Sequence, residues 1–257
     1  MSSDSSTWID AVVFSSLWLA AAAGALVAAA SGAMGIDTDP LAVGLAISGT
    51  LVVYNVDRLR DIDRDRRTSP ARSDFVSRHR ARLNGLTATA AVTAAIFAIS
   101  AGTQAALTLA PVLLIGLFHR RLKKFAAAKA AYVTAAWLCV VVGLPLVLGQ
   151  HAAHVGWVAA ILGPSIGANA IAANLRDFEA GVEHWGEVVA LRAARALAGA
   201  GVVLCALAPG PVGSMLAVPL FTLIALALFQ RTERFGLFVV DGALLMGGLV
   251  AVALAWP

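Results

Sequence analysis

An acidic segment, residues 55–67 with the sequence NVDRLRDIDRDRR, follows an apolar run that is long enough to cross a membrane. Asp57, Asp61 and Asp65 are spaced four residues apart, so in a helix they share one face. Neighbours in this row lie about 6 Å apart along the helix axis, and the row cannot relieve its repulsion by internal pairing. Such carboxylates suit a hard cation that bridges to a phosphate, and the segment therefore predicts a Mg²⁺ site for a phosphorylated ligand.

Asn55 and Asp63 lie on the opposite face of the predicted helix, with Leu59 between them. The same segment allows another interpretation. Arg58, Arg60 and Arg64 alternate with the acids, a pattern that is typical of a solvated helix end with ion pairs four residues apart. The sequence alone leaves these possibilities open.

A second acidic segment, NLRDFE at residues 174–179, ends another apolar run. Asn174 and Asp177 are three residues apart and share a helix face, with Arg176 and Glu179 beside them. A row of glutamates at positions 179, 183 and 187 continues from it. These glutamates can be ligands, or they can be acids that favour the start of the next helix.

A basic element, HRRLKKFAAAK at residues 119–129, is the third candidate for chemistry. Its cations, among them Lys123 and Lys124, can bind an anionic diphosphate. They can equally reflect membrane topology and contact with anionic lipid headgroups.

The composition identifies the elements that must position these groups. Of 257 residues, 60% are hydrophobic and 13% are charged, and the mean hydropathy is +0.82. Soluble domains rarely have this composition, whereas polytopic membrane proteins do. The net charge of +4 does not indicate nucleic-acid binding, because all 19 Lys and Arg residues fall into four groups separated by apolar runs. The groups lie within residues 58–82, 120–129, 176–195 and 231–234.

We predict an all-α, polytopic membrane protein with a single domain over residues 1–257. Nine spans of about 20 residues fit the apolar runs. They cover roughly 9–31, 40–58, 83–101, 104–119, 130–149, 155–174, 188–208, 211–230 and 235–256. The basic groups predict that the acidic segments and the N-terminus are cytoplasmic, and that the C-terminus is external.

This arrangement resembles the UbiA superfamily of membrane-embedded prenyltransferases. That family has nine helices, an Asp-rich motif after helix two, a second one after helix six, and a Tyr-x-x-x-Lys element between helices four and five. The first segment resembles the family form Asn-Asp-x-x-Asp-x-x-x-Asp in two registers. One register matches Asn55 and Asp63 but has Val56 and Leu59 in place of aspartates. The other uses the row of three aspartates and loses the Asn, and we prefer it because three carboxylates then share one face.

The other elements resemble the family pattern with departures. HRRLKKF resembles Tyr-Pro-Leu-Leu-Lys-Arg-Phe, so His119 replaces the Tyr and Lys123 keeps its place. NLRDFEAG resembles Asp-Ile-Arg-Asp-x-Glu-Gly-Asp, with matches at Arg176, Asp177 and Glu179. Asn174 replaces an acid and Gly181 replaces the last Asp, so the second metal site is weakened, rebuilt or lost. The loop RRTSPARSDFV resembles the Asn-x-Pro-x-Arg stretch that follows the first motif.

The resemblance implies an isoprenyl diphosphate donor, Mg²⁺ as the cofactor, and an aromatic or other lipophilic acceptor in a bacterial or archaeal plasma membrane. The implied metal ligands are Asp57, Asp61, Asp65 and Asp177, with Glu179. The implied substrate-binding residues are Asn55, Lys123, Lys124, Arg176 and Asn174.

Two other functions are compatible with the same pattern. One is a terpene cyclase or diphosphate lyase, in which the allylic cation attacks its own chain. The other is a non-catalytic lipid-binding membrane protein, suggested by Gly181 and His119. A separate expectation concerns Asp241, six residues into the last predicted span, which we expect to pair with Arg234 or Arg231 at the membrane interface.

Overall fold

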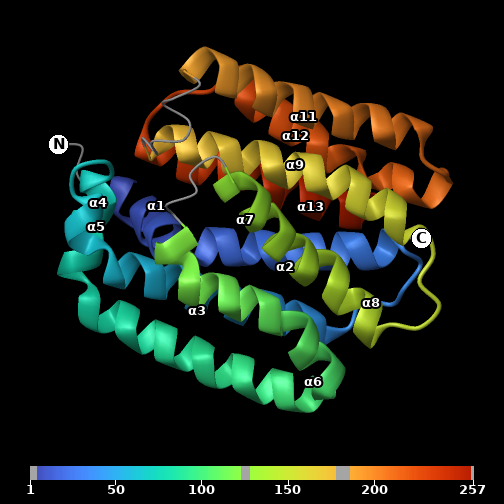
Figure 1. The fold of residues 1–257 in the computed structure, drawn as a ribbon, viewed down its shortest axis with the longest axis horizontal. Coiled ribbons are helices and arrows are strands. Elements are labelled where there is room, and N and C mark those ends of the chain that lie inside the picture. The colour runs from blue at the N-terminus through green and yellow to red at the C-terminus, as the bar shows by residue number, and fades with distance from the viewer. Residues whose placement is uncertain (1–4, 123–127, 178–185, 256–257) are drawn as a thin grey trace.

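The computed structural model describes residues 5–122, 128–177 and 186–255, and this part of the chain is helical with no β-strand (Figure 1). The elements are α1 (Ser5–Phe14), α2 (Leu17–Ala33), α3 (Pro40–Arg60), α4 (Ile62–Asp65), α5 (Pro70–Arg78), α6 (Arg80–Leu122), α7 (Lys129–Leu138), η2 (Cys139–Gly143), α8 (Leu144–Leu148), α9 (Val155–Arg176), α11 (Glu187–Leu207), η3 (Gly210–Leu216), α12 (Ala217–Ala227), η4 (Phe235–Val240) and α13 (Asp241–Ala255). By length and composition, seven described helices can cross a membrane, or eight if the bent pair α1–α2 is one span. The prediction of an all-helical polytopic membrane protein is confirmed at this level.

The first predicted span is bent by 61° between α1 and α2. Ser16, with φ of 65°, lies at the bend, and its hydroxyl donates a 2.8 Å hydrogen bond to Asn55 Oδ1. Arg58 Nη1 donates to the last carbonyls of α1, those of Val13 at 3.1 Å and Phe14 at 2.6 Å. A cation at these carbonyls satisfies the helix C-terminus. Residues at the end of α3 therefore stabilise a bend that hydropathy did not predict.

Helix α6 is a hairpin of two helices that reverses direction at Gly102, where φ is 83° and ψ is −179°. Ala90, from its first half, clusters with Leu51 of α3. Gly116, from its second half, faces Val53, two residues further along α3. A straight helix could not bring residues 90 and 116 to the same level, so the chain doubles back along α3 (Figure 1). The break lies in the connection predicted between spans 83–101 and 104–119.

The Ala-rich helix α2 lies in the middle of the bundle, between α3 and α13 (Figure 1). Close approach depends on small residues, as is common between membrane helices. A Cβ on Gly248 of α13 would lie 3.0 Å from Ala25 Cβ, and a Cβ on Gly24 would lie 2.8 Å from the Ile47 side chain of α3. These contacts hold the helices that carry the acidic segments in fixed positions.

The connections that carry Lys and Arg lie at one end of the bundle, the charged end, and the connections without Lys or Arg lie at the opposite end. At that opposite end, Ala153 N–H donates to Met34 O at 2.9 Å, and the end of α13 approaches Gly32. Helices α1, α4 and α5 gather at the other end (Figure 1). Both acidic segments belong to that charged end, as the four basic groups predicted.

Candidate functional site

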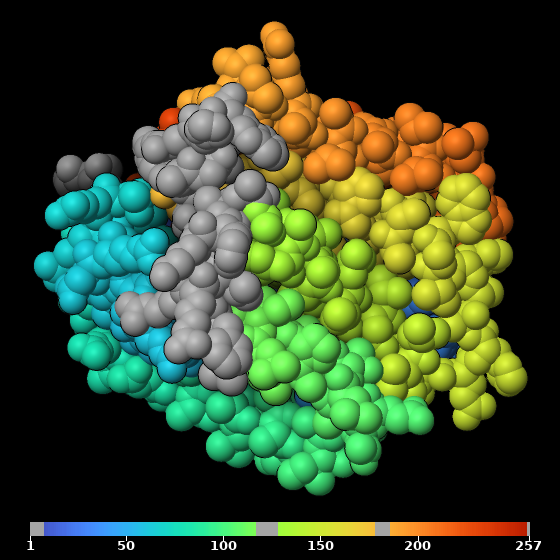
Figure 2. Space-filling view, in the orientation of Figure 1, coloured from blue at the N-terminus to red at the C-terminus, as the bar shows by residue number. Residues whose placement is uncertain are grey.

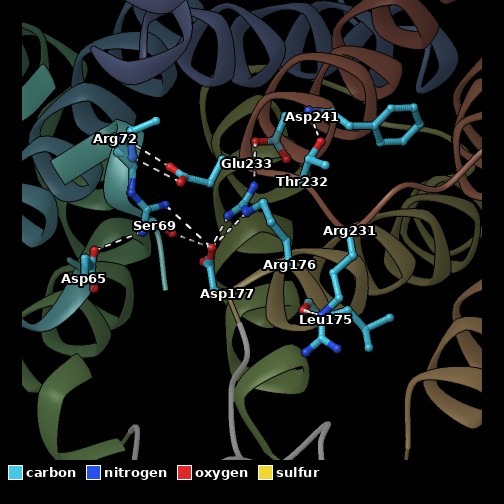
Figure 3. A network of polar contacts seen from close by, with 12 residues as sticks. Asp65, Ser69, Arg72, Leu175, Arg176, Asp177, Arg231, Thr232, Glu233 and Asp241 are labelled. Atoms are coloured by element: carbon cyan, nitrogen blue, oxygen red, sulfur yellow. Dashed lines mark hydrogen bonds and ion pairs between the residues drawn. The ribbon is translucent and has the colours of Figure 1, made fainter. Parts of the chain in front are cut away.

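The two acidic segments meet at the guanidinium of Arg72, on α5 (Figure 3). Arg72 Nη2 lies 2.9 Å from Asp65 Oδ2, and Arg72 Nη1 lies 3.7 Å from Asp177 Oδ1. Ser69 Oγ also donates to Asp177, at 3.4 Å. The Arg72 side chain is only 9% exposed, so these charges interact with little solvent screening. One buried cation therefore joins acids from segments that are far apart in the sequence.

Arg72 is positioned by the way the chain enters α5. The N–H of Ser69 donates to the carbonyl of Asp65 at 2.7 Å, which closes a turn between α4 and α5. The carboxylate of Glu233, from the connection before η4, accepts from the N–H groups of Ala71 and Arg72 at 3.2 and 2.9 Å. An acid at these N–H groups satisfies donors that the helix itself cannot. The turn between α4 and α5 and the carboxylate of Glu233 thus fix the start of α5, from which the Arg72 side chain extends.

A second buried guanidinium, that of Arg176 at the end of α9, lies beside the first. It donates two hydrogen bonds to Asp177, at 2.9 and 3.0 Å, and its Nη1 lies 3.9 Å from Asp241 Oδ2. Asn169 Nδ2 donates to the other Asp241 oxygen at 3.2 Å. Gly236 makes room for the arginine, because a Cβ there would lie 2.4 Å from Arg176 Cδ. The site extends in this way from the charged end into the bundle (Figure 3).

The predicted partners of Asp241 were wrong. Arg231 pairs with Glu187 at 3.2 Å, and Arg234 makes two hydrogen bonds with Asp10, at 3.1 and 2.9 Å. Asp241 lies on the side of α13 that faces α9, whereas Arg234 faces α1, so sequence proximity does not bring them together. Glu187 starts α11, which agrees with the interpretation that an acid favours the helix start.

The first acidic segment is helical but not continuous. Helix α3 ends at Arg60, and Asp61, with φ of −104° and ψ of 14°, separates it from α4. Hydrogen bonds from Asp61 N to Asp57 O and from Asp65 N to Asp61 O, at 3.0 and 2.9 Å, span the break and preserve the four-residue spacing. Asp61 is 1% exposed, and its neighbours in the row, Asp57 and Asp65, are half-buried. Asp63, in contrast, is exposed. The row of three aspartates faces inward, and Asp63 faces outward.

Two buried nitrogen donors at this end of the bundle have no hydrogen-bond acceptor within the described residues: Asn55 Nδ2 and Arg176 Nη1. Asn55 binds Ser16 through its oxygen, and Arg176 Nη1 has its ion pair with Asp241. Asn174 is also buried, at 4% exposure, on the same helix as Arg176. Unused donors are typical of a place that accepts an anion, because a cation would need oxygen lone pairs instead.

The carboxylates do not form a ready-made metal cage. Within residues 5–122, 128–177 and 186–255, no three His, Cys, Asp or Glu side chains are grouped so that they could hold an ion. Three predicted residues, Lys123, Lys124 and Glu179, lie outside the described residues. Mg²⁺ in phosphate-binding sites is commonly held by one or two carboxylates together with phosphate oxygens. Asp57 and Asp61 are carboxylates of this type on the inward-facing row.

The electrostatic environment of Asp177 is dominated by cations. Burial by itself raises the pKa of this carboxyl, but the charges of Arg176 and Arg72 outweigh burial and hold the pKa well below its ordinary value of 3.8. Lys129, at the start of α7, acts in the same direction. Asp177 is therefore an anion at any physiological pH, and the basic group at 120–129 extends to the site through Lys129.

Sequence reasoning missed three contributors to this site. Arg72 stood in the loop that resembles the family's Asn-x-Pro-x-Arg stretch, which was a usable signal, but no role was assigned to it. Asn169 is a polar residue within an apolar span, a second usable signal. Glu233 carried no signal, because its role depends on a tertiary contact that brings the segment before η4 to the start of α5.

Comparisons with known proteins add no relative. No protein-family model matches the chain, and no match was found among curated proteins or among solved structures. The resemblance to the UbiA superfamily therefore depends on the motifs and their order along the chain.

Proposed function

We propose that this chain is an intramembrane prenyltransferase of the UbiA type, which ionises an isoprenyl diphosphate and transfers the prenyl group to a lipophilic acceptor. One observation carries the proposal: acids from both predicted motifs, Asp65 and Asp177, lie against the single buried guanidinium of Arg72. This convergence supports the proposal, because a diphosphate site of this type is built from charged groups of separate loops at one membrane surface.

In the proposed reaction, the guanidinium groups of Arg72 and Arg176, with Lys123 and Lys124, bind the diphosphate oxygens. Bidentate guanidinium–phosphate pairing is favourable, so the ligand competes with the carboxylates for both arginines. Asp177 and Asp65 are released as the arginines turn toward the diphosphate.

The released acids complete the proposed ligand set. Asp57, Asp61, Asp65 and Asp177 would hold Mg²⁺ together with the diphosphate oxygens, with Glu179 and the Asn174 side chain as further oxygen donors. When bound, Mg²⁺ neutralises the charge that develops on the departing diphosphate. The row of aspartates provides the negative charge that keeps the ion at the end of α3.

The remaining allylic cation needs surroundings that exclude water. Most buried side chains of the bundle are apolar. The proposal requires an opening toward the lipid through which the prenyl tail enters from the side. The four basic groups favour a cytoplasmic position for the charged end. With the bent α1–α2 pair and the α6 hairpin counted as one and two spans, nine membrane crossings complete the proposed topology.

Diphosphate release by the purified protein tests the proposal. Protein in detergent or nanodiscs is incubated with isoprenyl diphosphates of increasing chain length, with and without aromatic acceptors, in Mg²⁺ or in EDTA. Mg²⁺-dependent release coupled to a prenylated acceptor is the expected result. No release with any donor, from protein that still unfolds cooperatively, would overturn the proposal.

One observation favours a terpene cyclase as the second candidate. An acceptor needs polar anchors in the bundle, yet buried hydroxyls of the described spans donate to carbonyls of their own helices. These hydroxyls belong to Ser31, Ser48, Ser165 and Thr222. Formation of a cyclic hydrocarbon or alcohol without any acceptor would establish this alternative.

A non-catalytic lipid-binding protein is the third candidate. It is favoured by the ion pair between Arg176 and Asp177, in which the two charges already neutralise each other. Mg²⁺-dependent binding of a non-hydrolysable diphosphate analogue, with no turnover of any donor, would identify it.

A further inference from the structure

We propose that a pocket at the start of α6 binds the phosphate group of an anionic phospholipid, separately from the site between the acidic segments. The pocket has a volume of about 280 Å³ and is lined by Arg78, His79, Ala81 and Arg82. It lies where α5 ends at Arg78 and α6 begins at Arg80, so arginines from two helices flank the histidine. No acidic side chain lines it.

Two of the lining residues, Arg78 and His79, are held by contacts with α5. Arg78 Nε donates to Asp74 O at 3.3 Å, which fixes the direction of its guanidinium. The His79 ring stacks on Phe75 with centroids 4.4 Å apart, and its Nδ1 lies 3.0 Å from Phe75 O. In the tautomer in which Nδ1–H donates to Phe75 O, Nε2 lies on the other side of the ring and takes no part in that contact. Arg82 makes no ion pair or hydrogen bond with any residue that the structure describes.

An exposed apolar stripe continues directly from the pocket. From Arg82, the same face of α6 is formed by positions three or four residues apart, all of them exposed. These positions are Gly85, Thr89, Val92, Ile96 and Ile99. The exposed fractions of Val92, Ile96 and Ile99 are 61%, 56% and 82%. Large apolar side chains exposed in a row belong in contact with lipid.

The distance from the pocket to the exposed apolar side chains of α6 matches the length of one phospholipid. Ten residues separate Arg82 from Val92, which corresponds to about 15 Å of helix, half of a bilayer core of about 30 Å. A phosphate bound by Arg82 therefore leaves its acyl chains along Val92 and Ile96. Gly85 adds space between the two regions, because a Cβ there would contact nothing within 4 Å. Helix α6 forms one outer edge of the molecule (Figure 2), where a bilayer lipid can approach it.

The chemistry favours an anionic phospholipid over other phosphates. A soluble phosphate would gain the arginines but not the apolar stripe, and a zwitterionic lipid would bring a second cation close to the guanidinium groups. The pocket also belongs to the charged end of the bundle, at the level where headgroups begin. Position, charge and stripe together specify a lipid with a net negative headgroup.

Lipid titration of the purified protein tests this inference. Binding of phosphatidylglycerol and of phosphatidylcholine is measured by native mass spectrometry, with inorganic phosphate as a further probe. We expect phosphatidylglycerol to bind the wild-type protein more tightly than phosphatidylcholine. The double variant Arg78→Gln/Arg82→Gln should bind phosphatidylglycerol at least about tenfold more weakly.

A matched control separates the pocket from general surface charge. Arg66→Gln/Arg67→Gln removes the same charge from two exposed arginines outside the pocket, and should change phosphatidylglycerol affinity by less than about twofold. Equal losses in both double variants would overturn the inference, as would equal affinity for both lipids. Displacement of phosphatidylglycerol by inorganic phosphate at the same concentration would also overturn the inference, because the apolar stripe would then contribute nothing to lipid affinity. All four arginines are exposed, so both variants should retain the wild-type unfolding temperature in lipid-free detergent.

Discussion

Asp65 and Asp177 face each other across the guanidinium of Arg72, at 2.9 and 3.7 Å from its nitrogen atoms. Two carboxylates this close would repel each other in a buried site, and the arginine between them makes their approach favourable. The protein thus holds a cation of its own where its two acidic segments meet. A ligand that binds arginine more tightly than a carboxylate does, such as a diphosphate, must displace Asp65 and Asp177 from Arg72.

Removing this shared cation should destabilise the fold. Arg72→Ala leaves Asp65 without its 2.9 Å partner and weakens the environment of Asp177, so we expect a loss of about 3 kcal/mol in the free energy of unfolding. Denaturant unfolding of the purified protein in detergent measures it. Arg66→Ala, at an exposed position, is the matched control and should cost less than about 0.5 kcal/mol. Equal effects of the two substitutions would contradict a bridging role for Arg72.

The two registers of the first motif predict different variants to be inactive. Asp61 is buried in the inward-facing row, whereas Asp63 is exposed. If the proposed function is correct, Asp61→Asn should lower kcat/KM for diphosphate release by about 100-fold, and Asp63→Asn should change it less than about threefold. Initial rates over a range of Mg²⁺ concentrations provide the measurement. The opposite order of sensitivity would assign the metal to the register of Asn55 and Asp63.

Acid should remove part of the stability that Asp177 provides. The pKa of Asp177 is lowered in the folded protein, so its charged form stabilises the fold above the unfolded value of about 4 and this contribution declines as the pH falls below it. The unfolding free energies of wild type and Asp177→Asn should therefore differ most at pH 6 to 7 and converge as the pH falls below about 4. Urea titrations at several pH values measure the two curves. A constant difference across that range would contradict the lowered pKa.

Gly236 should be intolerant of a methyl group because Arg176 fills the space beside it. A Cβ at this position would lie 2.4 Å from Arg176 Cδ, and the arginine is held by two hydrogen bonds to Asp177. We expect Gly236→Ala to cost about 1–3 kcal/mol and to weaken binding of a diphosphate analogue. Gly199→Ala is the control, since a Cβ at Gly199 of α11 meets nothing within 4 Å. Wild-type stability and binding in Gly236→Ala would show that Arg176 is free to move.

Local patterns predicted much of the molecule. Apolar runs located the membrane-crossing helices because a helix of about 20 apolar residues is a property of consecutive residues. The spacing of the acids placed Asp57, Asp61 and Asp65 on one face. The predicted break between spans 83–101 and 104–119 is where α6 reverses, at Gly102. The distribution of Lys and Arg predicted that both acidic segments lie at one end of the bundle, as the structure shows.

The partners of the charged groups were decided by the tertiary structure. Many arginines surround few acids at that end, and sequence separation does not rank the possible pairs. Asp241, at the start of α13, contacts Asn169 and Arg176 of α9. Glu233, just before η4, accepts a hydrogen bond from the N–H group of Arg72 on α5. The bend at Ser16 likewise depends on Asn55 and Arg58 of another helix. The sequence alone determined which residues carry charge and at which end they lie, whereas the contacts between distant helices decided which charges meet, because ion pairing depends on distances that only packing sets.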